Sequence, residues 1–214
     1  ERLGTTPWAT RARTELRAQD VTGVEVPGAY LVLRQTREIW EITLVSYPME
    51  VADLSLLDNA LTNGMSVWNA VALFGEYELV RTTVLSEADV VLRWSNEIAP
   101  VDHSECPPVF SNGVTTFCIE DLDATPLRLA TFPQPGTPDA RGVKMLVTIL
   151  ASQATIPGRI DRLVAHELGH VLGIGRHSPE PSDLMYQEPA RTTLSRRDVA
   201  TVQVLYHTDP DVFP

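Results

Sequence analysis

Two histidines and a glutamate stand at a spacing that suits a metal ion. His166, Glu167 and His170 form the pattern H-E-x-x-H. Residues four apart on a helix lie on the same face, so both imidazoles can bind one zinc ion. Glu167, next to the first histidine, can then reach a water on the metal without binding the metal itself. The spacing therefore predicts a zinc site on a helix.

A glycine and a third histidine follow this pair. Gly173 falls where the helix would end, and glycine accepts the left-handed conformation that reverses a chain there. The reversal would bring His177 to the metal as a third ligand, with Asp183, Glu180 or no third ligand as the alternatives. Three protein ligands and one open position for water are typical of a catalytic zinc site.

The stretch resembles the metzincin peptidases, whose pattern is H-E-x-x-H-x-x-G-x-x-H followed by a methionine turn. The residues that match in type and spacing are His166, Glu167, His170 and Gly173. His177 stands one position later than in the pattern, and Arg176 at the family position cannot bind a metal because its guanidinium stays protonated. A one-residue insertion accommodated by Gly175 restores the alignment. Met185 and Tyr186 then follow as in the matrixin subgroup.

The resemblance implies an α+β fold, the α/β-type sandwich of metzincins. We expect a twisted, mostly parallel mixed sheet of roughly four to five strands packed on two long helices. A C-terminal helix would follow the Met-turn. Met185 would form an apolar floor beneath the zinc ligands, and Gln187–Pro189 would line the S1′ pocket.

The same resemblance implies a secreted zinc endopeptidase that cuts extended polypeptides. Glu167 would act as general base toward a zinc-bound water. One alternative is a metal-binding module that is non-catalytic, or that is inhibited by its own N-terminal arm through Asp20. Another is an aminopeptidase or dipeptidase, although no recognition site for a substrate terminus is visible. The intact Glu167 favours the endopeptidase.

Composition limits the classes of partner. The chain of 214 residues has 43% apolar and 21% charged residues, as an ordinary globular protein has. No apolar run is long enough to span a membrane. The net charge of −11 argues against nucleic acid, and the excess of carboxylates is compatible with calcium. We expect a monomer whose partner is a polypeptide substrate, and a leader that has been removed, since the chain opens on Glu1 and Arg2.

The two cysteines of the chain predict a disulfide. Cys106 and Cys118 lie close together in a segment rich in Pro, Ser, Asn and Gly. In an oxidising compartment a bridge across such a short loop would contribute about 3 kcal/mol. The alternatives are two free thiols, or a second zinc site that also uses His103.

Hydrophobic periodicity gives the organisation of the chain. Residues 1–37 form an N-terminal extension or prosegment-like arm, and residues 38–214 form the catalytic domain. Helices are predicted over 51–74, over 159–172 and from the Ser195–Asp198 cap onward, and strands over 40–44, 77–83, 88–94, 127–132 and 143–150.

Leu127–Phe132 resembles the edge strand that lies antiparallel to bound peptide in matrixins. The acidic run Glu120–Asp123, within a loop over 95–126, fits either a solvated face or a calcium site.

Overall fold

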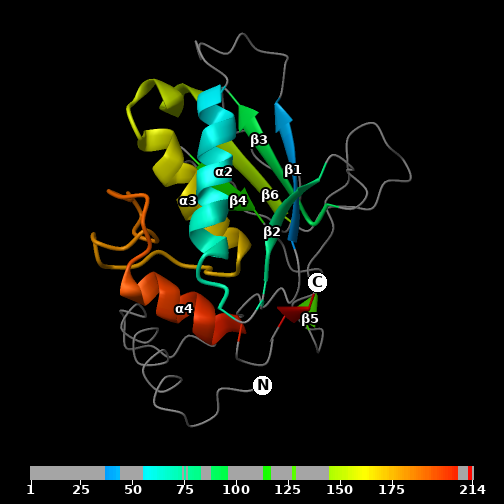
Figure 1. Cartoon of the computed structure of the whole chain (residues 1–214), viewed down its shortest axis with the longest axis vertical. Helices are drawn as coiled ribbons and strands as arrows, with labels where there is room; N and C mark the ends of the chain where they lie inside the picture. The colour runs from blue at the N-terminus through cyan, green and yellow to red at the C-terminus, as the bar shows by residue number, and fades with distance from the viewer. Residues whose placement is uncertain are drawn as a thin grey trace.

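The computed structural model describes most of the second half of the chain and separate segments of the first half. The described residues are 37–43, 55–73, 75, 77–82, 88–95, 113–116, 127–128, 145–206 and 212–213. The elements in chain order are β1 Arg37–Thr43, α2 Ser55–Asn69, β2 Leu79–Thr82, β3 Val90–Ser95, β4 Gly113–Thr116, β5 Leu127–Arg128, β6 Met145–Leu150, the 3₁₀ helix η2 Ala151–Thr155, α3 Arg159–Val171, α4 Arg196–Tyr206 and β7 Val212–Phe213 (Figure 1).

Five strands form a mixed sheet in the order β2-β1-β3-β6-β4. β1 runs parallel to β2 and β3, and β3 runs parallel to β6, whereas β4 runs antiparallel to β6. The central strand β3 buries all of its residues except Arg93. Such a continuous buried run is typical of a parallel strand that is covered on both faces. The predicted α+β fold with a mostly parallel mixed sheet is therefore confirmed.

Two long helices cover one face of this sheet. Figure 1 shows α2 and α3 side by side in front of the strands. α2 buries the apolar stripe that its spacing predicts, which consists of Leu57, Leu61, Met65 and Trp68. The indole Nε1 of Trp68 donates a hydrogen bond of 2.7 Å to the carbonyl of Ala165 in α3. Trp68 is thus a core residue that fixes α2 against α3.

The edge of the sheet beside α3 is β4. The prediction that Leu127–Phe132 forms this edge was wrong, because β5 pairs in parallel with β7 in a separate two-stranded sheet. β4 lies inside the segment that was predicted to be one long loop. Its four residues, Gly-Val-Thr-Thr, are too few to show an alternating pattern. The antiparallel edge next to the histidine helix is therefore Gly113–Thr116.

Several predictions concern residues outside the described ranges. These are the N-terminal extension, the pairing of Cys106 with Cys118, the alternative cluster with His103, and the calcium site at Glu120–Asp123. They stay predictions. Among the residues that the structure describes, no helix is both long and apolar enough to cross a membrane.

Candidate metal centre

α3 places two of the histidines. His166 and His170 lie one helical turn apart, and the helix buries the residues around them, including Glu167 and Leu168. His166 itself is only 3% exposed. Because the two histidines are four residues apart, their imidazoles point to the same side of the helix. The predicted zinc helix over 159–172 is observed as Arg159–Val171.

A Schellman motif ends α3 and turns the chain back. Gly173 has a φ of 104°, in the left-handed region that glycine tolerates. Its amide donates to the carbonyl of His170 at 3.0 Å, and the amide of Ile174 donates to the carbonyl of Gly169 at 3.1 Å. Gly175 and Arg176 then lie in an exposed loop. The extra residue relative to the metzincin pattern is thus in a loop with free space around it, since nothing lies within 4 Å of a Cβ built on Gly175.

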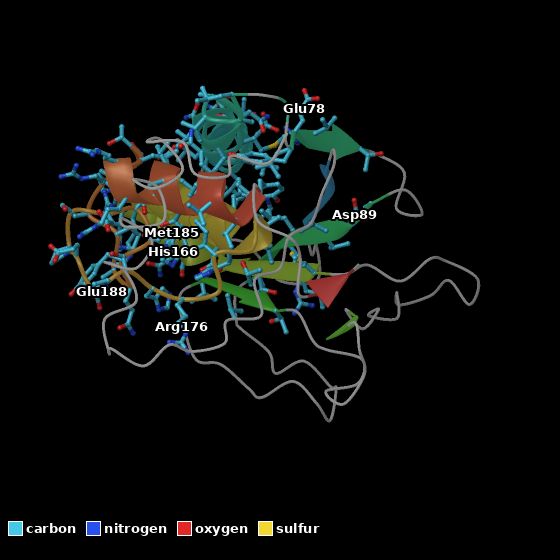
Figure 2. All side chains as sticks on the ribbon, turned by 90° about the horizontal axis from the view of Figure 1, so that it is seen from below. Glu78, Asp89, His166, Arg176, Met185 and Glu188 are labelled. Carbon is cyan, nitrogen blue, oxygen red and sulfur yellow. The ribbon has the colours of Figure 1, made fainter. Side chains whose placement is uncertain are left out.

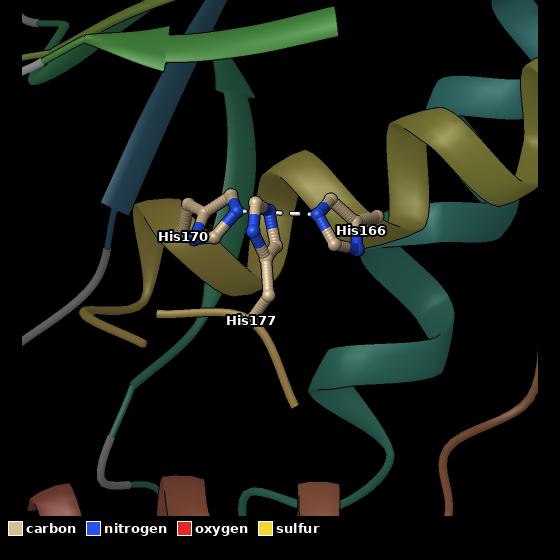
Figure 3. A group of neighbouring side chains, drawn as sticks. All are labelled: His166, His170 and His177. Carbon is tan, nitrogen blue, oxygen red and sulfur yellow. Dashed lines mark hydrogen bonds between the residues drawn. The ribbon is translucent and has the colours of Figure 1, made fainter. Parts of the chain in front are cut away.

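The reversal brings the third histidine to the other two. The ring centroid of His177 lies 5.1 Å from that of His166 and 5.2 Å from that of His170. One ligand atom of each ring lies within 4.8 Å of the others. Figure 3 shows the three rings turned toward a common point. The three predicted ligands therefore come together across the inserted residue.

Hydrogen bonds fix which nitrogen of each helical histidine faces that point. Nδ1 of His166 lies 2.8 Å from the carbonyl of Leu184, and Nδ1 of His170 lies 2.5 Å from the carbonyl of Ile174. A carbonyl only accepts, so each Nδ1 bears the proton and donates it. Each Nε2 of a neutral ring then has a free lone pair. Carbonyl partners of this kind orient metal-binding histidines.

The neutral state of these rings follows from burial. Desolvation and repulsion from His170 together lower the pKa of His166 to about 4, although Glu167 and the hydrogen bond to Leu184 oppose the shift. Burial likewise lowers the pKa of His170 to about 4 and lowers that of His177. At neutral pH the two Nε2 lone pairs of the helical histidines thus face each other at 3.2 Å, the line drawn in Figure 3. Two lone pairs at this distance repel each other unless both bind the same cation.

The spacing of these donors suits zinc. Two nitrogens that each bind zinc tetrahedrally at about 2.0–2.1 Å lie roughly 3.3 Å apart. The Nε2 atoms of His166 and His170 lie 3.2 Å apart. Neutral imidazoles are also ligands that zinc prefers. The donor set therefore fits the ion that the sequence predicted.

The Met-turn lies directly under this site. Met185 is fully buried, and Figure 2 shows it close to His166. A Cβ built on Gly169 would lie 2.3 Å from the Met185 sulfur, so the thioether packs against the backbone of α3 between the two helical histidines. The amide of Ser178 donates to the carbonyl of Met185 at 2.7 Å, which joins the segment after His177 to the turn. Met185 thus packs against α3 next to the histidines, and its role as an apolar floor beneath a bound metal stays a prediction.

Residues 152–207 match the family model of the matrixins. The match spans α3, the loop with His177, the Met-turn and α4. It confirms the resemblance to matrixins over this segment, together with the three-histidine cluster. It also indicates a zinc metallopeptidase.

Asp183 and Glu180, the alternative third ligands, have other partners within residues 152–207. Asp183 is buried and accepts from the hydroxyl of Ser178 at 2.5 Å and from Nε of Arg197 at 3.0 Å. Glu180 lies 3.7 Å from the guanidinium of Arg197. Both carboxylates therefore hold the loop that follows His177 against α4. This arrangement favours His177 as the third ligand.

Asp198, a buried carboxylate in the first turn of α4, holds the backbone of the turn that contains Met185. Asp198 is fully buried and accepts from the amides of Leu184 at 2.9 Å and Met185 at 3.2 Å. Asp198 also accepts from the amide of Ser195, and its own amide donates to the Ser195 hydroxyl. This reciprocal pair is the predicted helix cap. Burial raises the pKa of Asp198, and these amide donors oppose the rise. The backbone of Leu184 thus connects Asp198, through its N–H, to His166, through its C=O.

Glu167 lies beneath the edge strand. Thr115 in β4 donates to Oε2 of Glu167 at 2.7 Å, and the same hydroxyl lies 3.1 Å from the Glu167 carbonyl. A Cβ on Gly113, two residues earlier, would lie 2.9 Å from Oε1, so a larger residue there would push the carboxylate out of its place. Burial raises the pKa of Glu167, while His166 and the hydrogen bonds of Thr115 oppose the rise.

The sequence did not single out Thr115, Gly113 or Arg197. The β-branched residues of Val114–Thr116 are a weak indication of a strand, but they do not indicate that this strand contacts α3. Arg197 lies within the predicted last helix, where a charged residue normally faces solvent. Only the tertiary structure shows which of these residues lie at the site.

Proposed function

We propose that the chain is a zinc-dependent endopeptidase of the matrixin type that hydrolyses peptide bonds of extended polypeptides. The observation that supports this most is the pair of unprotonated Nε2 atoms of His166 and His170, which face each other at 3.2 Å with His177 beside them. The matrixin match over residues 152–207 supports the same class of reaction.

His166, His170 and His177 would hold the zinc, and Asp198 and the carbonyls of the Met-turn and loop would orient their rings. When bound, zinc supplies Lewis-acid chemistry, in which it activates water and polarises the scissile carbonyl. Glu167 would take a proton from the attacking water as general base and then give it to the leaving amine. Its burial next to His166 keeps the carboxylate in place for both transfers.

The edge strand β4 would align the substrate. It pairs with β6 on one side only in the five-stranded sheet, and it lies directly over Glu167. An extended peptide that adds to such an edge gains main-chain hydrogen bonds, with little dependence on side chains. Specificity would then come from pockets such as the wall at Gln187–Pro189. This arrangement suits cleavage within a polypeptide.

Secretion and the Cys106–Cys118 disulfide belong to the same proposal. A disulfide requires an oxidising compartment, and an extracellular peptidase meets polypeptides there. A zinc-binding module without activity is the competing possibility, and the following experiment separates the two.

The test is cleavage of casein, an unstructured protein, by the zinc-loaded chain. We expect cleavage that a zinc chelator abolishes and that added zinc restores. Glu167→Ala should keep about one zinc per chain and lose activity by a factor of at least about 10². Glu78→Ala removes an exposed carboxylate far from the histidines and should cleave casein normally (Figure 2). A zinc-loaded chain that leaves casein intact, or a fully active Glu167→Ala variant, would refute the proposed function.

A further inference from the structure

The hydroxyl of Thr115 lies between two acceptors that belong to the same residue. It is 2.7 Å from Oε2 of Glu167 and 3.1 Å from the backbone carbonyl of Glu167. A hydroxyl has one proton to donate and can accept as well. Thr115 can therefore donate to either oxygen and, when it donates to the carbonyl, accept a hydrogen bond from a protonated carboxyl group.

We propose that Thr115 is a positioning residue that holds the side chain of Glu167 through both of the states that the carboxylate passes through in one turnover. The proposal rests on the proposed role of Glu167 as general base. Glu167 enters the general-base step as the carboxylate, and Thr115 donates to Oε2. This leaves Oε1, the oxygen beside Gly113, to accept the proton of the attacking water.

The second state follows that transfer. The O–H bond of the water breaks and its proton binds the carboxylate. The resulting hydroxide forms a bond to the scissile carbon while the π bond of the carbonyl breaks and its electron pair moves to the carbonyl oxygen. If the proton is on Oε1, Thr115 continues to donate to Oε2. If it is on Oε2, the Thr115 hydroxyl rotates, donates to the Glu167 carbonyl and accepts from Oε2–H. In both cases the buried carboxyl group keeps its hydrogen-bond partner until the proton moves to the leaving amine.

The backbone N–H of Thr115 also supports the Glu167 carboxylate, but of these two donors only the hydroxyl can both donate and accept. Glu167 is only 4% exposed, so an unpaired polar atom there would be destabilising. Gly113, the other β4 residue that faces the carboxylate, has no side chain to offer. β4 is also the strand on which the substrate would lie, so the residue that holds the base and the edge that aligns the peptide belong to one element.

Two complementary substitutions separate positioning from packing. Thr115→Val keeps the shape and removes the hydroxyl, whereas Thr115→Ser keeps the hydroxyl and removes a methyl group. With zinc-loaded chain and fluorescently labelled casein, we expect Thr115→Val to lower kcat about 10- to 100-fold, with KM within about twofold. Thr115→Ser should stay within about threefold in kcat. Thr155→Val is the matched control, since the Thr155 hydroxyl also donates to a carbonyl, that of Ser152, away from the histidines.

A measurement that needs no activity tests the hydrogen bond itself. Isotope-edited infrared spectra of the zinc-loaded chain at alkaline pH, with a Glu167→Gln sample subtracted, isolate the Glu167 carboxylate stretch. The stretch should shift in Thr115→Val and stay in place in Thr115→Ser and Thr155→Val. If wild-type chain leaves casein intact, the proposed function fails, whereas the infrared result still decides the role of Thr115.

Three results would overturn the proposal. The first is a Thr115→Val variant with wild-type kcat or an unshifted carboxylate stretch. The second is a Thr115→Ser variant as impaired as Thr115→Val, which would mean that the methyl group matters. The third is a loss of zinc and of thermal stability in Thr115→Val with unchanged kcat per bound zinc, which would make the role of Thr115 purely structural.

Discussion

Replacing Gly169 by alanine tests the contact between the zinc helix and the Met-turn. A Cβ at this position would lie 2.3 Å from the sulfur of Met185 and 2.7 Å from Cζ2 of Trp68. Neither neighbour can move away easily. Both side chains are fully buried, the indole is hydrogen-bonded to Ala165, and the Met185 amide is held by Asp198. The added methyl group must therefore displace α3 or the turn.

The size of the effect follows from two opposing terms. Overpacking a dense core costs about 1–3 kcal/mol, and two contacts below 3 Å place this site at the upper end. The higher helix propensity of alanine over glycine stabilises the folded state by about 1 kcal/mol. We therefore expect a net loss of about 2 kcal/mol in the free energy of unfolding. In a chain of this size that corresponds to a melting temperature lower by about 4–8 °C.

Two other glycines provide graded controls. Gly64→Ala, also in a helix, would meet the side-chain ends of Val164 and Leu168 at 3.0 and 3.1 Å, which can yield slightly. The cost of these tight contacts and the gain in helix propensity should nearly cancel, so the free energy of unfolding should change little. Gly175→Ala has nothing within 4 Å and should be neutral. Urea unfolding of the metal-free variants measures all three, and a Gly169→Ala variant as stable as Gly175→Ala would refute the packing argument.

Four further predictions concern the site. His177→Ala should lower zinc affinity and activity severely in a chelator-competition assay, whereas deletion of Gly175 should be better tolerated; the reverse order would contradict His177 as a ligand. Asp198→Ala should leave the Leu184 and Met185 amides unpaired and cost about 2 kcal/mol or more in urea unfolding; an unchanged midpoint would contradict this. Arg197→Ala should weaken zinc binding moderately, and equal affinity would show that the loop needs no support. Metal-free chain should lose stability as pH falls from about 6.5 toward 4, because unfolding lets the histidines with lowered pKa bind protons; a flat profile would contradict their burial.

The sequence predicted the parts of the site that lie close together in the chain. The four-residue spacing of His166 and His170 fixes a common face on any helix, and Gly173 marks the reversal that brings His177 back. The cap formed by Ser195 and Asp198 was visible for the same reason. Local geometry alone determines such features, so the pattern of residue types is sufficient.

The features that sequence reasoning missed all depend on tertiary structure. β4 is a four-residue strand that forms only because β6 pairs with it, and its own residues show no period. The contact of Thr115 with Glu167 joins residues 52 positions apart. The assignment of the sheet edge to 127–132 failed similarly, because a short apolar run does not reveal which strand it pairs with. Pairing partners of short strands are set by the whole core.

The hydrogen bonds of Asp198 have a consequence for the synthesis of the chain. The ribosome makes all three histidines before it makes Asp198, the residue that holds the backbone of the Met-turn. A nascent chain that has already exposed His166, His170 and His177 therefore still lacks the support that orients its first ligand. The three-histidine site can become complete only after α4 has emerged and docked. Completion of the proposed zinc site is thus coupled to the synthesis of α4, and a chain interrupted before residue 198 should be a poor zinc binder despite containing all three histidines.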